Sequence, residues 1–313
     1  MLRVLLRRLA TAVPLVILVS ALTFVFVSAE PDNLVRKLLP TAGTTQEIRQ
    51  LRRQLGLDRP VYVQYWDWLS HAVRGDLGTG WVTHEPVLQT IVSGLPVTLS
   101  LVVGSVIAFL GVGVGLGVLS AVRGGFLGRA VDGVTLVAYA LPGFWLGALL
   151  ITVFAVKLHV LPAIGYVSFS QSPAEWARSL VLPIAALTMS GVALVAKQTR
   201  EAMIDALSSE HVRMAWANGL PRRDIYFRLA LKSAGGVIVT IGGLVAIALL
   251  LGTVFVEQVF AIPGLGSALV SATVNGDIPV VLGITVVFTL IIIVINLIVD
   301  LTYTALDPRV RTS

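Results

Sequence analysis

The sequence predicts an all-α membrane protein with six transmembrane helices. Of its 313 residues, 56% are hydrophobic and only 13% are charged, and the mean hydropathy is +0.89. A soluble domain has about 25% charged residues. A helix needs about 20 apolar residues to cross a bilayer core of about 30 Å. Six stretches without an ionisable side chain approach or exceed that length: 9–29, 86–122, 133–156, 179–196, 233–256 and 278–299.

The first expected span belongs to the N-terminal segment 1–29. Arg3, Arg7 and Arg8 precede it, so a cleaved signal peptide is an alternative. The uncharged stretch has 21 residues, whereas the apolar core of a signal peptide has about 7–15. The length therefore favours a retained span.

Residues 30–94 form an external segment that is expected to be helical in part. Thr44 and Glu47 fit a capping box ahead of an apolar helical stripe. The aromatic run 61–69 predicts either a helix at the membrane interface or a docking surface for an external partner. Gly75-Asp76-Leu77-Gly78 predicts the turn that returns the chain to the membrane.

The other five spans form a core at 95–299. The 37-residue stretch would give a helix of about 56 Å, so its first residues, 86–94, are expected at the interface. The five spans are then expected at about 95–121, 133–156, 179–196, 233–256 and 278–299. A cytoplasmic tail is expected at 300–313.

The distribution of Lys and Arg orients the chain. Segments expected in the cytoplasm carry 14 of the 23 basic residues, whereas the two short external loops, 157–178 and 257–277, carry two. Basic residues beside spans are retained on the cytoplasmic side. Both termini are therefore expected to be cytoplasmic.

The sequence lacks the groups that several membrane machines need. No span has an ionisable residue at its core, which argues against a proton-driven pump or a voltage sensor. There is no cysteine and no Gly-Lys-Ser/Thr phosphate loop, and the four histidines lack metal-ligand spacing. The sequence therefore predicts no catalytic, cofactor-binding or metal-binding residue, and energy for uphill transport would come from another chain.

The longest cytoplasmic loop, 197–232, is the strongest candidate for a functional element. Ser208 or Ser209 can cap a helix that Gly219 ends, and a second helix is expected over 221–232. A DNA-binding helix-turn-helix is disfavoured because spans tether the hairpin at both ends. A plain basic loop is an alternative, but a helix that docks in a groove of a cytoplasmic partner is favoured.

At this loop the sequence resembles the permease subunit of ABC importers of the dipeptide/oligopeptide/nickel class. The class commonly reads Val-Arg-Thr-Ala-Arg-Ala-Lys-Gly-Leu in its coupling helix, and residues 212–220 read Val-Arg-Met-Ala-Trp-Ala-Asn-Gly-Leu. Ala215 and Gly219 match the general importer motif Glu-Ala-Ala, three residues and Gly, whereas Arg213 stands at its Glu. Two usual basic residues of the class are replaced, by Trp216 and Asn218.

Further segments resemble the class in the same order along nearly the whole chain. They are residues 55–60 and 74–78, 158–162, 257–266 with 277–279, and 307–309. The Gly-Asp-Pro that usually follows the first span is absent, and Ala29-Glu30-Pro31-Asp32 stands in its place.

The resemblance implies a type I ABC importer permease fold and ATP-driven uptake of dipeptides or oligopeptides across a bacterial inner membrane. It also implies a homologous second permease, two ATPase subunits, an extracellular binding protein and membrane lipid as partners, but no nucleic acid. ATP and Mg would lie on the ATPases, and this chain would hold no cofactor. Nickel chelates, glutathione or haem are alternative cargoes; a secondary transporter or a membrane scaffold is a more distant alternative.

The resemblance also places the contact with the ATPases. In the class, ATP binding closes the ATPases, and the coupling helix passes that movement to the spans on either side. The coupling residues expected in this chain are Glu210, Arg213, Ala215, Trp216, Gly219, Leu220 and Arg222. The sequence assigns no residue to the substrate pathway.

Overall fold

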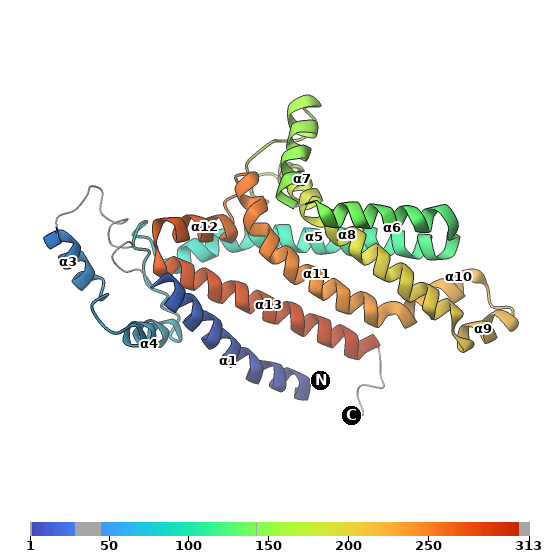
Figure 1. Ribbon diagram of the computed structural model, residues 1–313, viewed down its shortest axis with the longest axis horizontal. Coiled ribbons are helices and arrows are strands. Elements are labelled where there is room, and N and C mark those ends of the chain that lie inside the picture. The colour runs from blue at the N-terminus through green and yellow to red at the C-terminus, as the bar shows by residue number, and fades with distance from the viewer. Residues whose placement is uncertain (1, 29–44, 142, 307–313) are drawn as a thin grey trace. The chain divides into compact units, whose positions relative to one another are not determined.

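The computed structural model describes residues 2–28, 45–141 and 143–306 (Figure 1). Helices joined by turns and loops make up these residues, and the β-structure among them is one isolated bridge between Thr79 and Pro86. The helices form two compact units. Unit 1 comprises residues 1–98 and 263–293, and unit 2 comprises residues 99–262 and 294–313.

Five helical stretches among the described residues are long and apolar enough to cross a membrane. They are α1 (Leu2–Val27), α5 (Val87–Arg123), α8 (Pro173–Ser208), α11 (Leu231–Val259) together with the residues from Arg222 that lead into it, and α13 (Ile278–Leu306). Each covers most or all of one predicted uncharged stretch. The residues expected at the interface before the second span belong to the same unbroken helix, α5.

The stretch expected to span at 133–156 is not one helix. It is divided between α6 (Gly125–Ala140), α7 (Gly143–Leu150) and the π-helical segment η1 (Ile151–Lys157). Leu141, which precedes a proline in the sequence, is extended, with φ −95° and ψ 123°. A proline ring disfavours the helical conformation at the residue before it. The expectation of a single uninterrupted helix here was therefore wrong.

In unit 1, the helix expected after the capping box is present as α3 (Thr45–Gln54), and the aromatic run 61–69 lies in a second helix, α4 (Val61–Ala72). They pack with α1 and the start of α13 around an apolar cluster. Its buried members are Phe24, Leu57, Ile278 and Leu282. Thr44, the first residue of the expected capping box, lies outside the described residues.

The turn expected at residues 75–78 is confirmed. Gly75 and Gly78 have φ of +86° and +82°, and the Asp76 carboxylate accepts a hydrogen bond of 2.9 Å from the Gly78 amide. Only glycine adopts such φ values readily. The next loop is fastened by Asp277, just before α13, whose buried carboxylate accepts hydrogen bonds from the amides of Trp81 and Val82.

In unit 1, the helix α12 (Leu265–Asn275) begins at a side-chain contact with α5. The Thr98 hydroxyl accepts a hydrogen bond of 2.8 Å from the Leu265 amide. A Cβ on Gly94 would lie 3.0 Å from the Leu265 side chain, so the glycine permits the close approach. This contact joins the two sequence-distant parts of unit 1.

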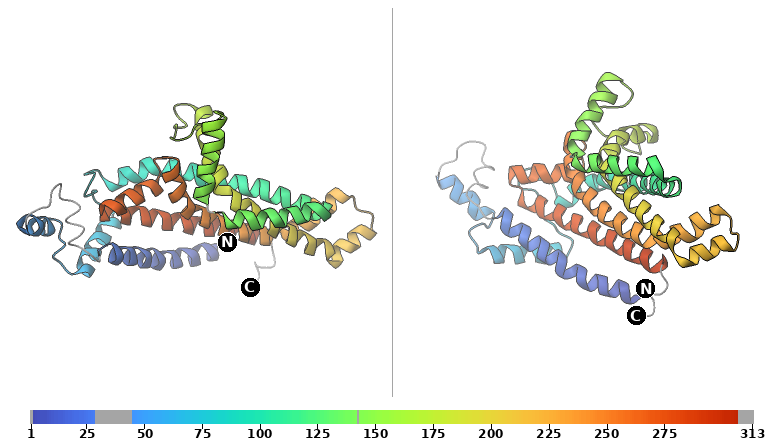
Figure 2. Two further views of the ribbon diagram at one scale, coloured as in Figure 1. Left: turned by 45° about the horizontal axis from the view of Figure 1, so that its top comes forward. Right: turned by 45° about the vertical axis from the view of Figure 1, so that its right-hand side comes forward.

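In unit 2, α8 packs against α6, α7 and α11. Glycines on α5 allow a close approach to α8, because a Cβ on Gly117 would lie 2.6 Å from the Ala196 carbonyl oxygen. Figures 1 and 2 show α8 and the start of α11 side by side, joined at one end by α9 (Glu210–Ala217) and α10 (Arg222–Asp224). This hairpin end carries the predicted functional loop.

Candidate functional site

The short helix α9 at the hairpin end of unit 2 is the candidate site. One residue, Ser209, separates it from α8. Gly219, with φ +74°, follows its C-terminus. The Gly219 amide donates to the Trp216 carbonyl, and the Leu220 amide donates to the Ala215 carbonyl. This is the Schellman arrangement, so the expectation that Gly219 ends the helix is confirmed.

The two serines before α9 act differently from the expected cap. Ser209 holds the N-cap position, but its side chain makes no capping hydrogen bond. The Ser208 and Ser209 hydroxyls donate instead to the carbonyls of Asp205 and Ala206 in α8. Both hydroxyls thus bond back to the last turn of α8, and the extended backbone at Ser209 (φ −70°, ψ 152°) ends that helix before α9 begins.

The second arm of the hairpin is not a separate helix over 221–232. From α10 the backbone passes through the π-helical segment η2 (Ile225–Ala230) directly into α11, with helical dihedral angles at each junction. The expected boundary at Lys232 was placed where the charged sequence gives way to the apolar stretch from Ser233. Neither residue breaks a helix, so the helix continues across that boundary. The hairpin therefore leaves through the same continuous helix that forms the next long apolar segment.

A small apolar core braces α9 against this second arm. Its fully or nearly buried members are Val212, Ala215 and Ile225. The rings of Trp216 and Tyr226 add an edge-to-face contact, with centroids 6.1 Å apart. Such pairs contribute about 0.5–1.5 kcal/mol beyond the area they bury. α9 is thus packed against η2 through buried and aromatic side chains.

The predicted coupling residues divide into two groups. Ala215 is buried and Gly219 forms the turn, so both shape the hairpin. The other five side chains are exposed to a partner: Glu210, Arg213, Trp216, Leu220 and Arg222. Among them, Trp216 is 39% exposed and also packs on Tyr226.

The sequence analysis missed two exposed apolar side chains of the hairpin. Met214 is 67% exposed and Phe227 is 56% exposed. Met214 lies four residues after Glu210 and therefore shares its helix face, opposite the buried Val212 and Ala215. The four-residue spacing of Glu210 and Met214 could have been used to predict from the sequence that Met214 is exposed. A flexible methionine is well suited to fill an irregular groove.

The exposed surface around these apolar side chains is basic. Arg213, Arg222 and Arg223 are exposed, and Arg228 is paired with Asp224 at 3.3 Å. A surface of this charge complements an acidic groove and would steer association with it.

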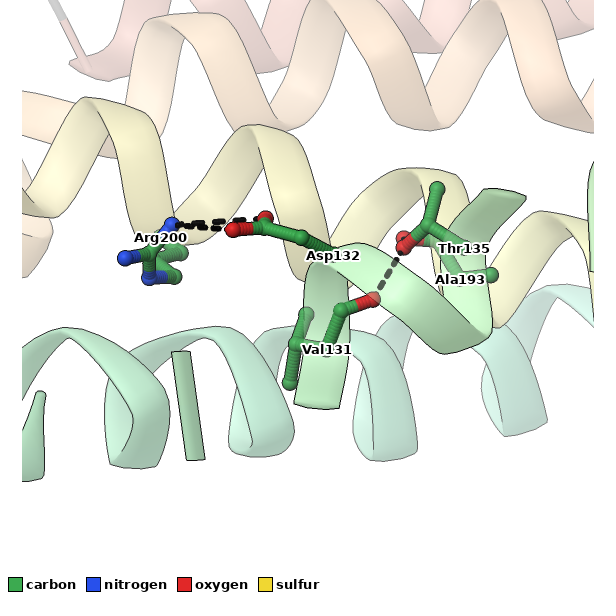
Figure 3. A network of polar contacts seen from close by, with 5 residues as sticks. All are labelled: Val131, Asp132, Thr135, Ala193 and Arg200. Carbon is green, nitrogen blue, oxygen red and sulfur yellow. Dashed lines mark hydrogen bonds and ion pairs between the residues drawn. The ribbon is translucent and has the colours of Figure 1, made fainter. Parts of the chain in front are cut away.

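An ion pair connects α8 to α6 about two turns before α8 ends (Figure 3). Arg200 Nη1 lies 3.2 Å from Asp132 Oδ2 and 3.3 Å from Asp132 Oδ1. A Cβ on Gly128 would lie 2.6 Å from Arg200 Nη2, so the small residue makes room for the guanidinium. The Thr135 hydroxyl lies 2.7 Å from the Val131 carbonyl and 3.1 Å from the Ala193 carbonyl. Together these contacts tie α6 to α8.

Within the described part of the chain, no three His, Asp or Glu side chains are grouped so that they could hold a metal ion. The geometry offers an exposed short helix, α9, that is connected to two long helices, α8 and α11. It is suited to mechanical transmission.

Two family models match the chain. Residues 113–312 match the binding-protein-dependent transport system inner membrane component, and residues 1–102 match the N-terminal region of such membrane components. Together the two matches cover almost the whole sequence.

Curated relatives are similar over the full length. The chain is 34% identical over 307 residues to a putative peptide transport system permease protein of Brucella abortus (strain 2308). It is 36% identical over 307 residues to a probable peptide ABC transporter permease protein of Sinorhizobium fredii (strain NBRC 101917 / NGR234). Each of these two matches covers 98% of both chains. It is 35% identical over 312 residues to the glutathione transport system permease protein GsiC of Escherichia coli (strain K12), covering 99% of both.

A solved structure shares the fold. An inward-facing form of the MetNI methionine ABC transporter contains a chain that matches with a TM-score of 0.54 at 18% identity, covering 70% of this chain and 97% of that chain. At this identity the likeness speaks for the fold alone.

Proposed function

This chain belongs to the family of binding-protein-dependent transport system inner membrane components, and on that premise we propose that it forms half of a pathway for the uptake of short peptides. It is a multi-pass permease subunit of an ABC importer and is itself non-catalytic. Its system includes ATPase and binding-protein partners. Full-length similarity to two peptide permeases supports peptide cargo, and similarity to a glutathione permease makes glutathione the second candidate.

The proposed assembly pairs this chain with a homologous permease above two ATPase subunits, which hold ATP and Mg. In the proposed topology α6, α7 and η1 together form the third of six spans, between the external segment 30–94 and the cytoplasmic tail 300–313. The basic residues concentrated in segment 197–232, between the apolar parts of α8 and α11, support a cytoplasmic location for that segment and therefore for both termini.

The proposed coupling step uses α9 as a docked lever. Closure of the ATPases on ATP displaces α9, and α8 and α11 move with it because each is joined to the hairpin by almost continuous helix. The Asp132–Arg200 pair then carries the movement to α6. Packed helices shift as rigid bodies between discrete arrangements, so a small displacement at α9 is not absorbed locally.

One observation carries this proposal: α9 is buried against the second arm on one face and exposes the predicted coupling side chains on the other. The test is uptake by vesicles that hold the complete importer. We expect accumulation of labelled alanyl-alanine that requires ATP, the ATPases and the binding protein.

Two results would overturn this function. One is accumulation against a gradient by this chain alone, which would show that it carries its own energy source. The other is ATP-dependent uptake of glutathione with no competition from alanyl-alanine, which would replace the proposed cargo and leave the coupling mechanism standing.

A further inference from the structure

A groove of about 290 Å³ lies in unit 1 between α4, the end of α1 and the start of α13. Its floor is apolar and includes Phe24, Trp68, Trp81 and Leu282. Its rim is polar and charged. The volume is near the lower end of the range for small-molecule sites, about 300–1,000 Å³, so it suits a small polar group rather than a whole folded partner.

The helix α4 has three distinct faces, and their contacts indicate that the groove lies at the edge of the membrane. Tyr65 faces α1: its hydroxyl donates to the Ile17 carbonyl at 3.0 Å and lies 2.9 Å from Ser20 Oγ. Both α1 residues belong to an apolar stretch that is able to span, and Ser20 lies about 10 Å along the helix from Val27. α4 therefore lies beside a membrane-crossing part of α1.

A second face of α4 carries Tyr62 and Trp66, which are 74% and 69% exposed. They are four residues apart and thus neighbours on the helix surface. Tyr and Trp side chains concentrate at the depth of lipid headgroups. These exposed rings indicate that lipid surrounds this side of α4.

The third face of α4 lines the groove with Gln64, Asp67, Trp68 and His71, at the spacing of one helix face. Asp67 makes no side-chain hydrogen bond or ion pair within the described part of the chain. The Trp68 indole N–H is buried and has no acceptor there. Buried polar groups are almost always satisfied, so this N–H points to a missing partner that accepts a hydrogen bond.

Two charged residues outside α4 also line the groove. Arg59 also lines the groove, and its guanidinium makes no hydrogen bond or ion pair with the described residues. Asp76 accepts a hydrogen bond from the Gly78 amide with Oδ1, and its Oδ2 has no partner among the described residues. The groove thus combines one cation and one indole donor with two carboxylates, over an apolar floor.

We propose that this groove binds the headgroup of a phospholipid with a primary ammonium, that is, phosphatidylethanolamine. The phosphate pairs with Arg59 and accepts from the Trp68 N–H, and the ammonium donates to Asp67 and Asp76. A primary ammonium has three N–H donors for these carboxylates, whereas a choline headgroup has none. The acyl chains follow the side of α4 that exposes Tyr62 and Trp66. This site is independent of the cargo of the importer.

The test is native mass spectrometry of the full-length chain in detergent, with equal amounts of phosphatidylethanolamine, phosphatidylcholine and phosphatidylglycerol that share the same acyl chains. We expect phosphatidylethanolamine to be retained at least about threefold more than either competitor. Arg59→Gln and Asp67→Asn should abolish this preference. Trp68→Phe keeps an aromatic ring but removes the N–H, and should weaken it.

Two matched control variants are available in the same segment. Arg74→Gln and Glu85→Gln remove exposed charges that do not line the groove, so both should keep the preference of the unaltered chain. A loss in these variants equal to that in Arg59→Gln would overturn the site, because general charge would then explain the binding.

The remaining outcomes separate the ligand classes. Equal retention of phosphatidylcholine would overturn the ammonium pairing, and stronger retention of phosphatidylglycerol would overturn the assignment to a zwitterion. Displacement of the lipid by millimolar alanyl-alanine would assign the groove to cargo and overturn the lipid proposal. The preference of the unaltered chain decides the question even if a variant fails to fold.

Discussion

The coupling hairpin and the external segment are built from the same local parts but are connected differently. α3, α4 and α9 are all short helices that end in a Schellman turn with a left-handed glycine, at Gly56, Gly75 and Gly219. Each also packs an apolar face against longer helices. The difference lies in what adjoins each helix.

The hairpin is joined to α8 through one residue and to α11 without a helical break. α4, by contrast, is followed by a non-helical loop, which the Asp277 carboxylate holds through the amides of Trp81 and Val82. If α9 acts as proposed, its displacement would move two long helices, whereas a displacement of α4 would be absorbed in its loop. This difference in connection supports the proposed lever role of the hairpin and gives the external segment no comparable link to two long helices.

The largest difference in uptake is expected when the same backbone strain is introduced at the turn after α9 and at the turn after α4. Gly219→Val and Gly75→Val both place a β-branched residue at a positive φ, and neither added Cβ meets another atom within 4 Å. We expect Gly219→Val to lower ATP-driven peptide uptake at least about tenfold while part of the ATPase still copurifies. Gly75→Val should stay within about twofold of the unaltered importer. Unchanged uptake by Gly219→Val would refute the lever.

A second comparison removes a buried side chain from each region. Ile225→Ala and Leu57→Ala truncate residues that are 0% and 5% exposed, and each should lower stability by about 2–4 kcal/mol. Only Ile225→Ala should raise the ATP hydrolysed per peptide imported, because it loosens α9 from the second arm. Thermal unfolding and the ATP-to-peptide ratio measure the two effects separately. An equal rise in the ratio for Leu57→Ala would remove the distinction between the regions.

A charge exchange tests the link from α8 to α6. Asp132→Asn or Arg200→Gln alone should slow uptake by up to about fivefold, as expected for a partly exposed pair. The double change Asp132→Arg with Arg200→Asp should recover at least half of the loss. Initial uptake rates in vesicles provide the measurement. If the double variant is slower than both single variants, the pair does not transmit movement.

The smallest effect is expected at the exposed face of α9. Met214→Ala removes an apolar side chain that is 67% exposed, and should weaken association with the ATPases about two- to fivefold, since most interface residues contribute under about 1 kcal/mol. Val73→Ala, on the external segment and 81% exposed, is the control and should leave ATPase copurification unchanged. Equal loss in both variants would argue against docking through Met214.

Much of the structure of the two regions could be predicted from local features of the sequence. The glycines at 75 and 219 were readable as turns because few other residues adopt their φ values. Four of the six predicted spans correspond to single long helices, and another lies within the longer α5, because uncharged length is a strong signal. The break between α6 and α7 was also readable from the proline at 142, but counting uncharged residues alone concealed it.

Other features were not readable from local pattern. Ala215 matched a motif and was expected to contact the ATPases, but the structure buries it against the second arm, whereas Met214 went unnoticed on the exposed face. The Asp132–Arg200 pair joins residues 68 positions apart, and nothing in a single sequence states which charges meet at that distance.

The sequence by itself determined that the protein is helical and membrane-bound and where its turns at Gly75 and Gly219 lie; through the resemblance at residues 212–220 it also supplied the coupling loop that we propose. These properties depend on composition, on charge-free length and on the conformational range of single residues. Only the tertiary structure decided that the hairpin continues into α11, that α6 is tied to α8, and that Arg59, Asp67 and Trp68 share one groove. Those properties depend on how separate helices pack, and packing is set by contacts between residues distant in the chain.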